Sequence, residues 1–235
     1  MITRRLLLGT AAATAATGLY APRLRAAVPD TLRFASAAGG PRKVDPNLTT
    51  QGSDNWAVIQ MFEYLVQPPD GDFGVKPDDF QPWLAESWTT SEDGKTWIFK
   101  LRHGVQFHKG YGEMTSDDVT RSFLRARDSG VSMANYGNLA DIQSSGKYEV
   151  TIKLRNPDPM FLSSVVATRN VMVVSKKAEA ELGDKFATMP IGTGPYKIDR
   201  FDSAKGMFLS RHEGYWGEQA IIPKVECLYI ADTTA

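Results

Sequence analysis

The segment PWLAESWTTSEDGKTWIFKLRHGVQFHKG, Pro82–Gly110, contains the clearest secondary-structure pattern in the chain. Within it, TWIFKL (96–101) has a large apolar residue at every second position, namely Trp97, Phe99 and Leu101. In a β-strand these three residues would lie on one face. The preceding Asp93-Gly94 pair is typical of a tight turn, and ESWTTS (86–91) lies on its other side. The segment therefore predicts a β-hairpin with one apolar face.

Strand and helix patterns alternate on both sides of this hairpin. KYEVTIKLR (147–155) alternates as a strand does, whereas MTSDDVTRSFLRARDSG (114–130) has an apolar helical stripe, with Thr115 as its cap and Gly130 at its end. We further expect strands at 31–36, in the apolar run 163–175 and at three places after residue 191, and helices at 54–66 and 176–186. This mixture without strict βαβ repeats predicts an α/β fold of the mixed α+β kind.

The first 27 residues are predicted to be an export signal rather than part of the fold. Adjacent Arg4 and Arg5 precede an uncharged run, Leu6–Pro22, that is rich in Ala, Thr and Gly. This run is too weakly apolar for a membrane anchor, and the arginine pair resembles a twin-arginine signal. An ordinary secretory signal that contains two arginines is the alternative. Both predict a location outside the cytoplasm, and we expect the periplasm.

Charge and cysteine content narrow the range of partners. Without residues 1–27 the chain has 23 basic and 27 acidic residues, a net charge of −4 with neutral histidines. A nucleic-acid-binding protein more often has a basic excess. Cys227 is the single cysteine, so no disulfide can form within one chain and no cysteine follows the signal to carry a lipid. We expect a freely diffusing monomer that does not bind nucleic acid.

His103 and His108 raise the question of a metal site, because the chain contains only three histidines. Both lie on a predicted strand end and turn, and His212 is far away in the sequence. Zinc sites usually have three or four ligands with recognisable short spacings, which are missing here. Surface or hydrogen-bonded turn histidines are the reading that we favour, so we predict no metal site and no cofactor.

No other motif indicates catalysis. The chain lacks the G-x-S-x-G nucleophile elbow. GTGPYK (192–197) lacks the spacing of a phosphate-binding loop, so its glycines are predicted to shape a turn that enters a strand. Aromatic residues in predicted loops suit the lining of a small-molecule cleft, although packing in the core is their commoner role. We predict no catalytic residue and no enzyme activity.

The order of the motifs is more informative than any one of them. The motifs VDPN, the Pro82–Gly110 segment, MTSDDVTRSF, YEVTIKLRNPDPMFL, IGTGPYKI and EGYWG follow one another from about Asp30 to Thr233. In this order the chain resembles the extracellular solute-binding proteins of family 5, the peptide- and nickel-type binding proteins of bacterial ABC importers. It departs from them at KGYGEMTS (109–116), where the family more often has an Asp-Gly pair and a proline.

The resemblance implies a two-lobed fold like that of type II periplasmic binding proteins. Lobe I would be discontinuous, formed by residues 28–52 and 169–235, and an inserted domain II would occupy residues 53–168. Family members are longer, so lobe III is expected to be absent from this chain. Because a cleft receptor buries its ligand between two surfaces, we expect the chain alone to bind weakly.

The function implied by the resemblance is that of a substrate-binding subunit of an ABC importer. Such a protein would bind peptides or a similar small solute in the periplasm and deliver it to a permease in the inner membrane. The ligand contacts implied are Ala38, Gly39 and Gly40 in the first loop, with Asn135 and Tyr136 from the inserted domain. For Tyr136, packing within that domain is an equally open alternative.

Two other functions stay open on the sequence alone. One is an exported metal-dependent hydrolase that would use His103, His108 and Glu113. The other is a truncated fragment that binds no ligand. The identity of any ligand is left open, because one scaffold can serve peptides, nickel complexes, opines and sugars.

Overall fold

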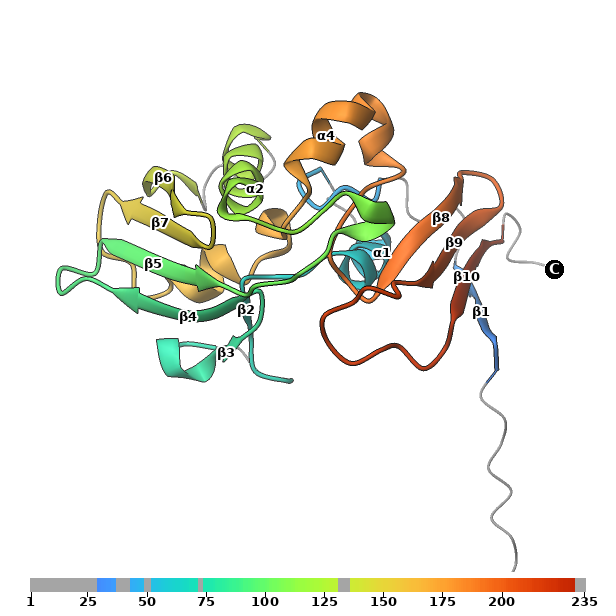
Figure 1. Cartoon of the computed structure of the whole chain (residues 1–235), viewed down its shortest axis with the longest axis horizontal. Coiled ribbons are helices and arrows are strands. Elements are labelled where there is room, and N and C mark those ends of the chain that lie inside the picture. Colours follow the sequence, from blue (N-terminus) through green and yellow to red (C-terminus); the bar gives the residue numbers. More distant parts are fainter. Residues whose placement is uncertain (1–28, 37–42, 49–51, 72–73, 131–135, 231–235) are drawn as a thin grey trace, which may run out of the picture.

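The computed structural model describes residues 29–36, 43–48, 52–71, 74–130 and 136–230, with residues 52–54 described by their backbone alone. Two four-stranded sheets lie at opposite ends of an elongated molecule, and the main helices lie between them (Figure 1). The elements in chain order are β1 (Thr31–Ser36), α1 (Gly52–Met61), β2 (Val66–Gln67), β3 (Gln81–Pro82), β4 (Ala85–Thr90), β5 (Thr96–Leu101), α2 (Ser116–Asp128), β6 (Leu139–Gly146), β7 (Glu149–Leu154), α4 (Lys176–Leu182), β8 (Tyr196–Asp202), β9 (Gly206–Arg211) and β10 (Lys224–Tyr229). This mixed α/β architecture confirms the predicted fold class.

The first sheet, in the order β4-β5-β7-β6, contains the predicted hairpin. All of its neighbouring strands are antiparallel. The backbone N–H of Ser91 donates to the carbonyl of Thr96 at 2.9 Å, and Gly94 has a φ of +67° in the turn between them. The alternate apolar residues of β5 are at most 4 % exposed. The hairpin and its apolar face are therefore confirmed.

The second sheet, in the order β1-β10-β9-β8, brings the two ends of the described chain together. β1 is parallel to β10, with Phe34 opposite Cys227, and the other pairs are antiparallel. A parallel pair needs a long crossover connection, and here the connection contains the whole first sheet. This chain course resembles the expected insertion into lobe I. The domain boundaries proposed from the sequence stay predictions.

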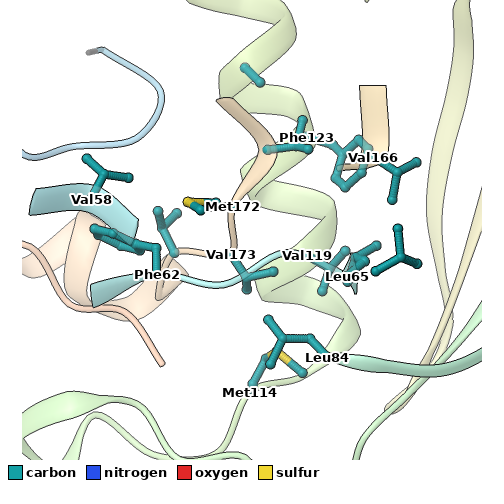
Figure 2. Packing of buried hydrophobic residues seen from close by; sticks show 14 of the residues in the cluster. Val58, Phe62, Leu65, Leu84, Met114, Val119, Phe123, Val166, Met172 and Val173 are labelled. Atoms are coloured by element: carbon teal, nitrogen blue, oxygen red, sulfur yellow. The ribbon is translucent and has the colours of Figure 1, made fainter. Parts of the chain in front are cut away.

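An apolar core connects the two ends of the molecule. Figure 2 shows Phe62, which directly follows α1, on one side of Met172 and Val173, with Val119 and Phe123 of α2 on the other side. Each of these five residues is at most 1 % exposed. Because burial of one such side chain contributes about 1.5–3 kcal/mol, this shared core joins α1 to α2 through the segment that contains Met172 and Val173.

Helix α2 begins and ends as the sequence predicts. Asp118 Oδ2 accepts a hydrogen bond from the backbone N–H of Thr115 at 2.9 Å, and Gly130 follows the helix with a φ of +73°. The Thr115–Asp118 hydrogen bond at the start of the helix, and the hydrogen bond from the Ser129 N–H to the Arg125 carbonyl at its end, give partners to terminal polar groups. The stripe that contains Val119 and Phe123 is buried, and this orients the opposite face of α2 outward.

The apolar run 163–175 contains no strand, so this prediction was wrong. A π-helical turn at Leu162–Val166 and a 3-10 turn at Arg169–Val171 are followed by a chain that passes between α1 and α2. The residues 171–174 are at most 1 % exposed because side chains surround them, not because a strand lies on each side. The apolar composition indicated burial, and burial alone does not specify strand pairing.

Other differences are smaller. α1 ends at Met61 and not at residue 66, and the sequence did not predict β6, most of whose residues are exposed on the edge of its sheet. The short helix at 176–186 is confirmed as α4 followed by a 3-10 turn at Gly183–Ala187. Within the ranges described above, every helix is too short or too polar to cross a membrane.

Candidate functional site

The loop after β1 is described from residue 43 to residue 48, and two of its polar side chains are buried. Asp45 and Asn47 are each 1 % exposed. The Asp45 carboxylate accepts two hydrogen bonds from Arg125 of α2, at 2.7 and 3.2 Å, and one from the backbone N–H of Asn47 at 3.0 Å. A buried carboxylate needs such partners, and a charged donor provides the strongest of them. The loop is thereby fixed to α2.

Arg125 also joins α2 to α4. Its Nε lies 2.9 Å from Oε1 of Glu179. Arg121 donates one hydrogen bond to each oxygen of the same carboxylate, at 2.5 Å to Oε1 and 2.7 Å to Oε2. Burial raises the pKa of Glu179, but the hydrogen bonds and charges of both arginines outweigh it and hold that pKa below its usual value. Three elements distant in sequence are therefore held by one charged cluster.

The turn that contains Thr168 and Asn170 lies beside the same loop. The side-chain amide of Asn47 donates to the backbone carbonyl of Asn170, and the Tyr136 hydroxyl lies 3.3 Å from Oγ1 of Thr168. Burial raises the pKa of Tyr136, and the positive charge of half-buried Arg169 opposes that shift. We call this region the first-loop surface, consisting of Pro46, Asn47, Tyr136, Thr168, Arg169 and Asn170.

Of the five predicted ligand contacts, only Tyr136 lies within the described residues. Its side chain is 1 % exposed and is among the largest buried side chains. Its position on the first-loop surface suits a role in shaping that surface, and direct contact with a ligand stays a prediction. Ala38, Gly39, Gly40 and Asn135 lie outside the described residues.

Sequence reasoning did not identify Arg125, which holds the first loop, or Arg169, which belongs to the first-loop surface. Arg125 lies on the polar side of a helix, where an arginine is commonly solvated, and Arg169 lies in the run mistaken for a strand. The sequence did contain one indication, Asp45 in VDPN, because a short polar side chain before a turn often accepts backbone hydrogen bonds. Its partner eighty residues later could not be read from the sequence.

The three residues of the hydrolase alternative do not converge on a common point. His103 is exposed and stacks on Tyr148 with 3.9 Å between ring centroids, whereas His108 is fully buried. Glu113 accepts hydrogen bonds from the backbone N–H of Gly104 and from Lys147. Over the described part of the chain, no group of three His, Cys, Asp or Glu side chains is arranged to hold a metal ion.

Both ring nitrogens of His108 have partners in the GTG turn. Nδ1 accepts from the backbone N–H of Gly192 at 3.3 Å, which leaves the proton on Nε2, 2.9 Å from the carbonyl oxygen of Gly194. Burial lowers the pKa of His108 to about 3, and the neighbouring charge of His212, Lys197 and Lys109 acts in the same direction. His108 is therefore a neutral side chain that connects the segment after β5 to the turn before β8.

The glycines of GTGPYK allow a close approach of two backbones. A Cβ on Gly192 would lie 2.0 Å from the carbonyl oxygen of Met61, and one on Gly194 would lie 2.7 Å from the carbonyl carbon of Met61. No side chain fits at either position. The turn leads directly into β8, which confirms the structural interpretation of this motif.

The EGYWG motif surrounds a second buried carboxylate. Glu63 is 4 % exposed and accepts hydrogen bonds from the indole nitrogens of Trp83 and Trp216 and from the hydroxyl of Tyr215, at 2.9 to 3.1 Å. Burial raises the pKa of Glu63, and these three donors oppose that shift. Arg102 lies over the Trp216 ring, 4.2 Å from its centroid. The hydrogen bonds of Glu63 thereby connect the segment after α1 with the segment after β9.

Comparison with known sequences identifies relatives that include periplasmic binding proteins. The profile described as "Bacterial extracellular solute-binding proteins, family 5 Middle" matches residues 79–235. The nickel-binding periplasmic protein of Escherichia coli K12 is 32 % identical over 221 residues, which cover 90 % of this chain and 39 % of the relative. The dipeptide-binding protein of the same strain is 26 % identical, with coverage of 83 % and 39 %. The chain thus spans about two fifths of the length of these relatives.

Solved structures agree in fold. The structure of the binding protein MoaA of A. tumefaciens R10, in complex with mannopinic acid, matches this chain with a TM-score of 0.80 and 27 % sequence identity. The match covers 87 % of this chain and 41 % of the MoaA chain. The periplasmic protein DppA of Helicobacter pylori, in complex with a peptide, has a TM-score of 0.75 and 27 % identity, with coverage of 87 % and 43 %. The fold, the motif order and the profile match lead to one conclusion. The chain belongs to the bacterial extracellular solute-binding proteins of family 5.

Proposed function

We propose that the chain forms part of the substrate-binding subunit of an ABC importer, and that the first-loop surface contributes one side of its ligand site. The subunit would bind a peptide or a similar small solute in the periplasm and present it to a membrane permease. The observation that carries this proposal is the fixed loop itself. Asp45 is buried and held by Arg125, so the segment 43–48 is held in place before any ligand arrives. Such preorganisation reduces the entropy cost of binding.

The chemistry of the first-loop surface favours a ligand with a carboxylate. Arg169 is half-buried, and its charge acts on the nearby Tyr64 and Tyr136 hydroxyl groups. A guanidinium in such a setting binds carboxylates well, because burial strengthens the charge-assisted hydrogen bond. The names of the relatives mention nickel, dipeptides and glutathione, and of these classes the peptides carry a free carboxylate.

An NMR titration tests this proposal even if binding is weak. We would add alanyl-leucine, glutathione, and nickel with histidine in turn to ¹⁵N-labelled chain and follow the backbone amide signals. We expect one of the peptide ligands to shift signals of residues 43–48, 136 and 168–170 in a saturable manner. The Arg169→Gln variant should weaken this binding about tenfold or more, since a charged hydrogen bond is lost.

Arg200→Gln is the matched control for that variant. Arg200 is an exposed arginine on β8 that lies over the Phe208 ring, away from the first-loop surface. Its replacement should leave the titration unchanged. Saturable shifts confined to other parts of the chain, or equal weakening by both variants, would contradict the proposed site, and absence of any shift with all three ligands would contradict the proposed function.

We also propose that residues 1–27 direct export by the twin-arginine route. A folded reporter fused to these residues should reach the periplasm, and the double variant Arg4→Lys, Arg5→Lys should remain inside the cell. Export that persists in the double variant, or in cells without the twin-arginine translocase, would instead favour an ordinary secretory signal. Fractionation of the cells with reporter activity as the readout separates these outcomes.

A further inference from the structure

Glu63, in the segment between α1 and β2, is a buried acid that lies outside the first-loop surface. Its two carboxylate oxygens have unequal hydrogen bonds. Oε1 accepts from the Trp83 indole and from the Tyr215 hydroxyl, both at 2.9 Å, whereas Oε2 accepts from the Trp216 indole at 3.1 Å. A proton on Oε2 disturbs fewer hydrogen bonds than a proton on Oε1, so Oε2 is the favoured atom for protonation.

Neutral donors, and not a cation, hold this carboxylate. Arg102 lies over the Trp216 ring, 4.2 Å from its centroid, and donates to the backbone carbonyl of Trp83 at 3.0 Å. Arg102 forms its ion pair with Glu86, at 3.8 Å, and over the described part of the chain Glu63 has no ion pair. Burial raises the pKa of Glu63, because no cation compensates the buried charge. Glu63 should therefore become neutral at a higher pH than an exposed glutamate.

Three other side chains around Glu63 bear on its protonation. Burial and the charge of Glu63 raise the pKa of Tyr215, so the Tyr215 hydroxyl remains a donor. Thr193 is fully buried, and its hydroxyl opposes the rise in the pKa of Glu63 but has no hydrogen-bond partner among the described residues. His212, whose carbonyl accepts from the backbone N–H of Tyr215, has a pKa that burial lowers. His212 is therefore the competing group that an experiment must separate from Glu63.

Trp216 belongs to a surface loop that can move without disturbing the core. The EGYWG loop (213–217) lies between β9 and β10, and its residues are exposed or half-buried. Trp83, by contrast, lies between β3 and β4 beside the fully buried Leu84. Local opening costs least where few side chains are buried. Loss of the contact between Glu63 and Trp216 would therefore loosen the loop and leave the sheet in place.

We propose that Glu63 is a proton-binding site that controls how the EGYWG loop is attached to the segment before β4. A proton from water binds to Oε2, and the hydrogen bond from Trp216 weakens because a protonated oxygen is a poorer acceptor than a charged one. The loop then loosens. Because burial raises the pKa of Glu63, the folded chain binds this proton more tightly than the unfolded chain, so acid does not lower the free energy of unfolding through this group. The change is therefore local, and it is independent of the first-loop surface.

NMR can follow the proton and the contact in one sample of the unchanged chain. We would label the glutamate carboxyl groups with ¹³C and the tryptophan indoles with ¹⁵N, and lower the pH from neutral to mildly acidic. The Glu63 carboxyl signal should titrate at a higher pH than those of exposed glutamates. The Trp216 indole proton signal should move upfield with the same midpoint, and the Trp83 signal should move less. Titration of Glu63 together with the exposed glutamates, or equal shifts of both indoles, would overturn the proposal.

Two variants assign the effect to Glu63. Glu63→Gln keeps an accepting oxygen but cannot ionise, so the Trp216 indole signal should lose its pH dependence in this range. Glu213→Gln removes an exposed acid of the same loop and should leave the titration of the Trp216 signal unchanged. A Trp216 shift that persists in Glu63→Gln would assign the proton to another group, with His212 the first to consider, and the proposal would be wrong. The comparison of midpoints in the unchanged chain decides the question even if a variant does not fold.

Discussion

Two contacts between the ends of the molecule use opposite chemistry. One is charged: Arg125 of α2 holds Asp45 of the first loop and Glu179 of α4. The other is neutral: His108 exchanges hydrogen bonds with the backbone of Gly192 and Gly194. Both connect the region predicted as domain II with the region predicted as lobe I, and both are largely or wholly buried.

The difference shows how one structure can be sensitive to different conditions at different places. The charged contact depends on both signs being present, so loss of one partner leaves a buried charge without compensation. The neutral contact depends on His108 remaining unprotonated, because a proton on Nδ1 would face the N–H of Gly192. Substitution should therefore affect the charged contact most, and acid should affect the neutral contact most.

The largest effect is expected for Arg125→Met. This change leaves the Asp45 carboxylate, 1 % exposed, without its charged partner, and should lower the free energy of unfolding by about 3–4 kcal/mol. Urea denaturation measures the loss. Adding Asp45→Asn to the variant should restore part of it, because the uncompensated charge is then removed.

Arg127→Met is the control for that variant. Arg127 pairs with Asp128 on the exposed side of the same helix, and such pairs contribute little to stability. If Arg125→Met lowered the free energy of unfolding no more than Arg127→Met does, the Arg125–Asp45 contact would contribute no more stability than an exposed ion pair. The expected difference between the charged and the neutral contact would then be wrong.

A smaller loss, about 2–3 kcal/mol, is expected for His108→Ala. The change creates a cavity and leaves the N–H of Gly192 and the carbonyl of Gly194 without partners. The full burial of His108 is consistent with a loss of this size. Thermal and urea unfolding should show His103→Ala close to the unchanged chain, and equal effects of the two variants would refute the assignment.

The effect of acid is expected to be smaller again. The pKa of His108 is about 3 in the folded chain against an ordinary value of 6.5, so between these values only the unfolded chain binds this proton. His108 therefore stabilises the fold fully above pH 6.5, and this contribution falls as pH decreases, by about 2 kcal/mol at a pH of about 5. Urea unfolding at neutral and acidic pH measures the slope.

The variant His108→Asn isolates that slope. An asparagine amide can both donate and accept a hydrogen bond without titrating in this range. We expect the loss of stability on acidification to be clearly smaller in this variant. The same loss in both chains would assign the pH dependence to other groups, of which His212, whose pKa burial also lowers, is the first to consider.

The family and much of the fold could be predicted from local pattern. The hairpin of β4 and β5, helix α2 and β8 to β10 depend on alternation, caps and turns, which neighbouring residues define. The segment after Thr168 could not be predicted in this way. Its valines are buried because α1 and α2 approach it from both sides, and that contact involves residues far away in the sequence.

The candidate site was predicted in outline only. The first loop was identified, but Arg125 was not, because its partner Asp45 lies eighty residues away in the sequence. Arg169 was missed because it lies in the run that was predicted to be a strand. A charged residue on a helix is ordinarily solvated, and only its tertiary partner reveals a buried role. The same holds for Trp97, whose place in a strand was predicted but whose buried indole N–H, without an acceptor among the described residues, was not.

The sequence by itself determined the order of elements, the hairpin, the helix caps and the membership of the family, since each depends on residues close together or on motif order. The tertiary structure alone decided that the histidines of KLRHGVQFHKG differ. His103 stacks on Tyr148 at the surface, while His108 is buried against the GTG turn. The physical reason is that burial and hydrogen-bond partners depend on distant parts of the chain, which no local spacing encodes.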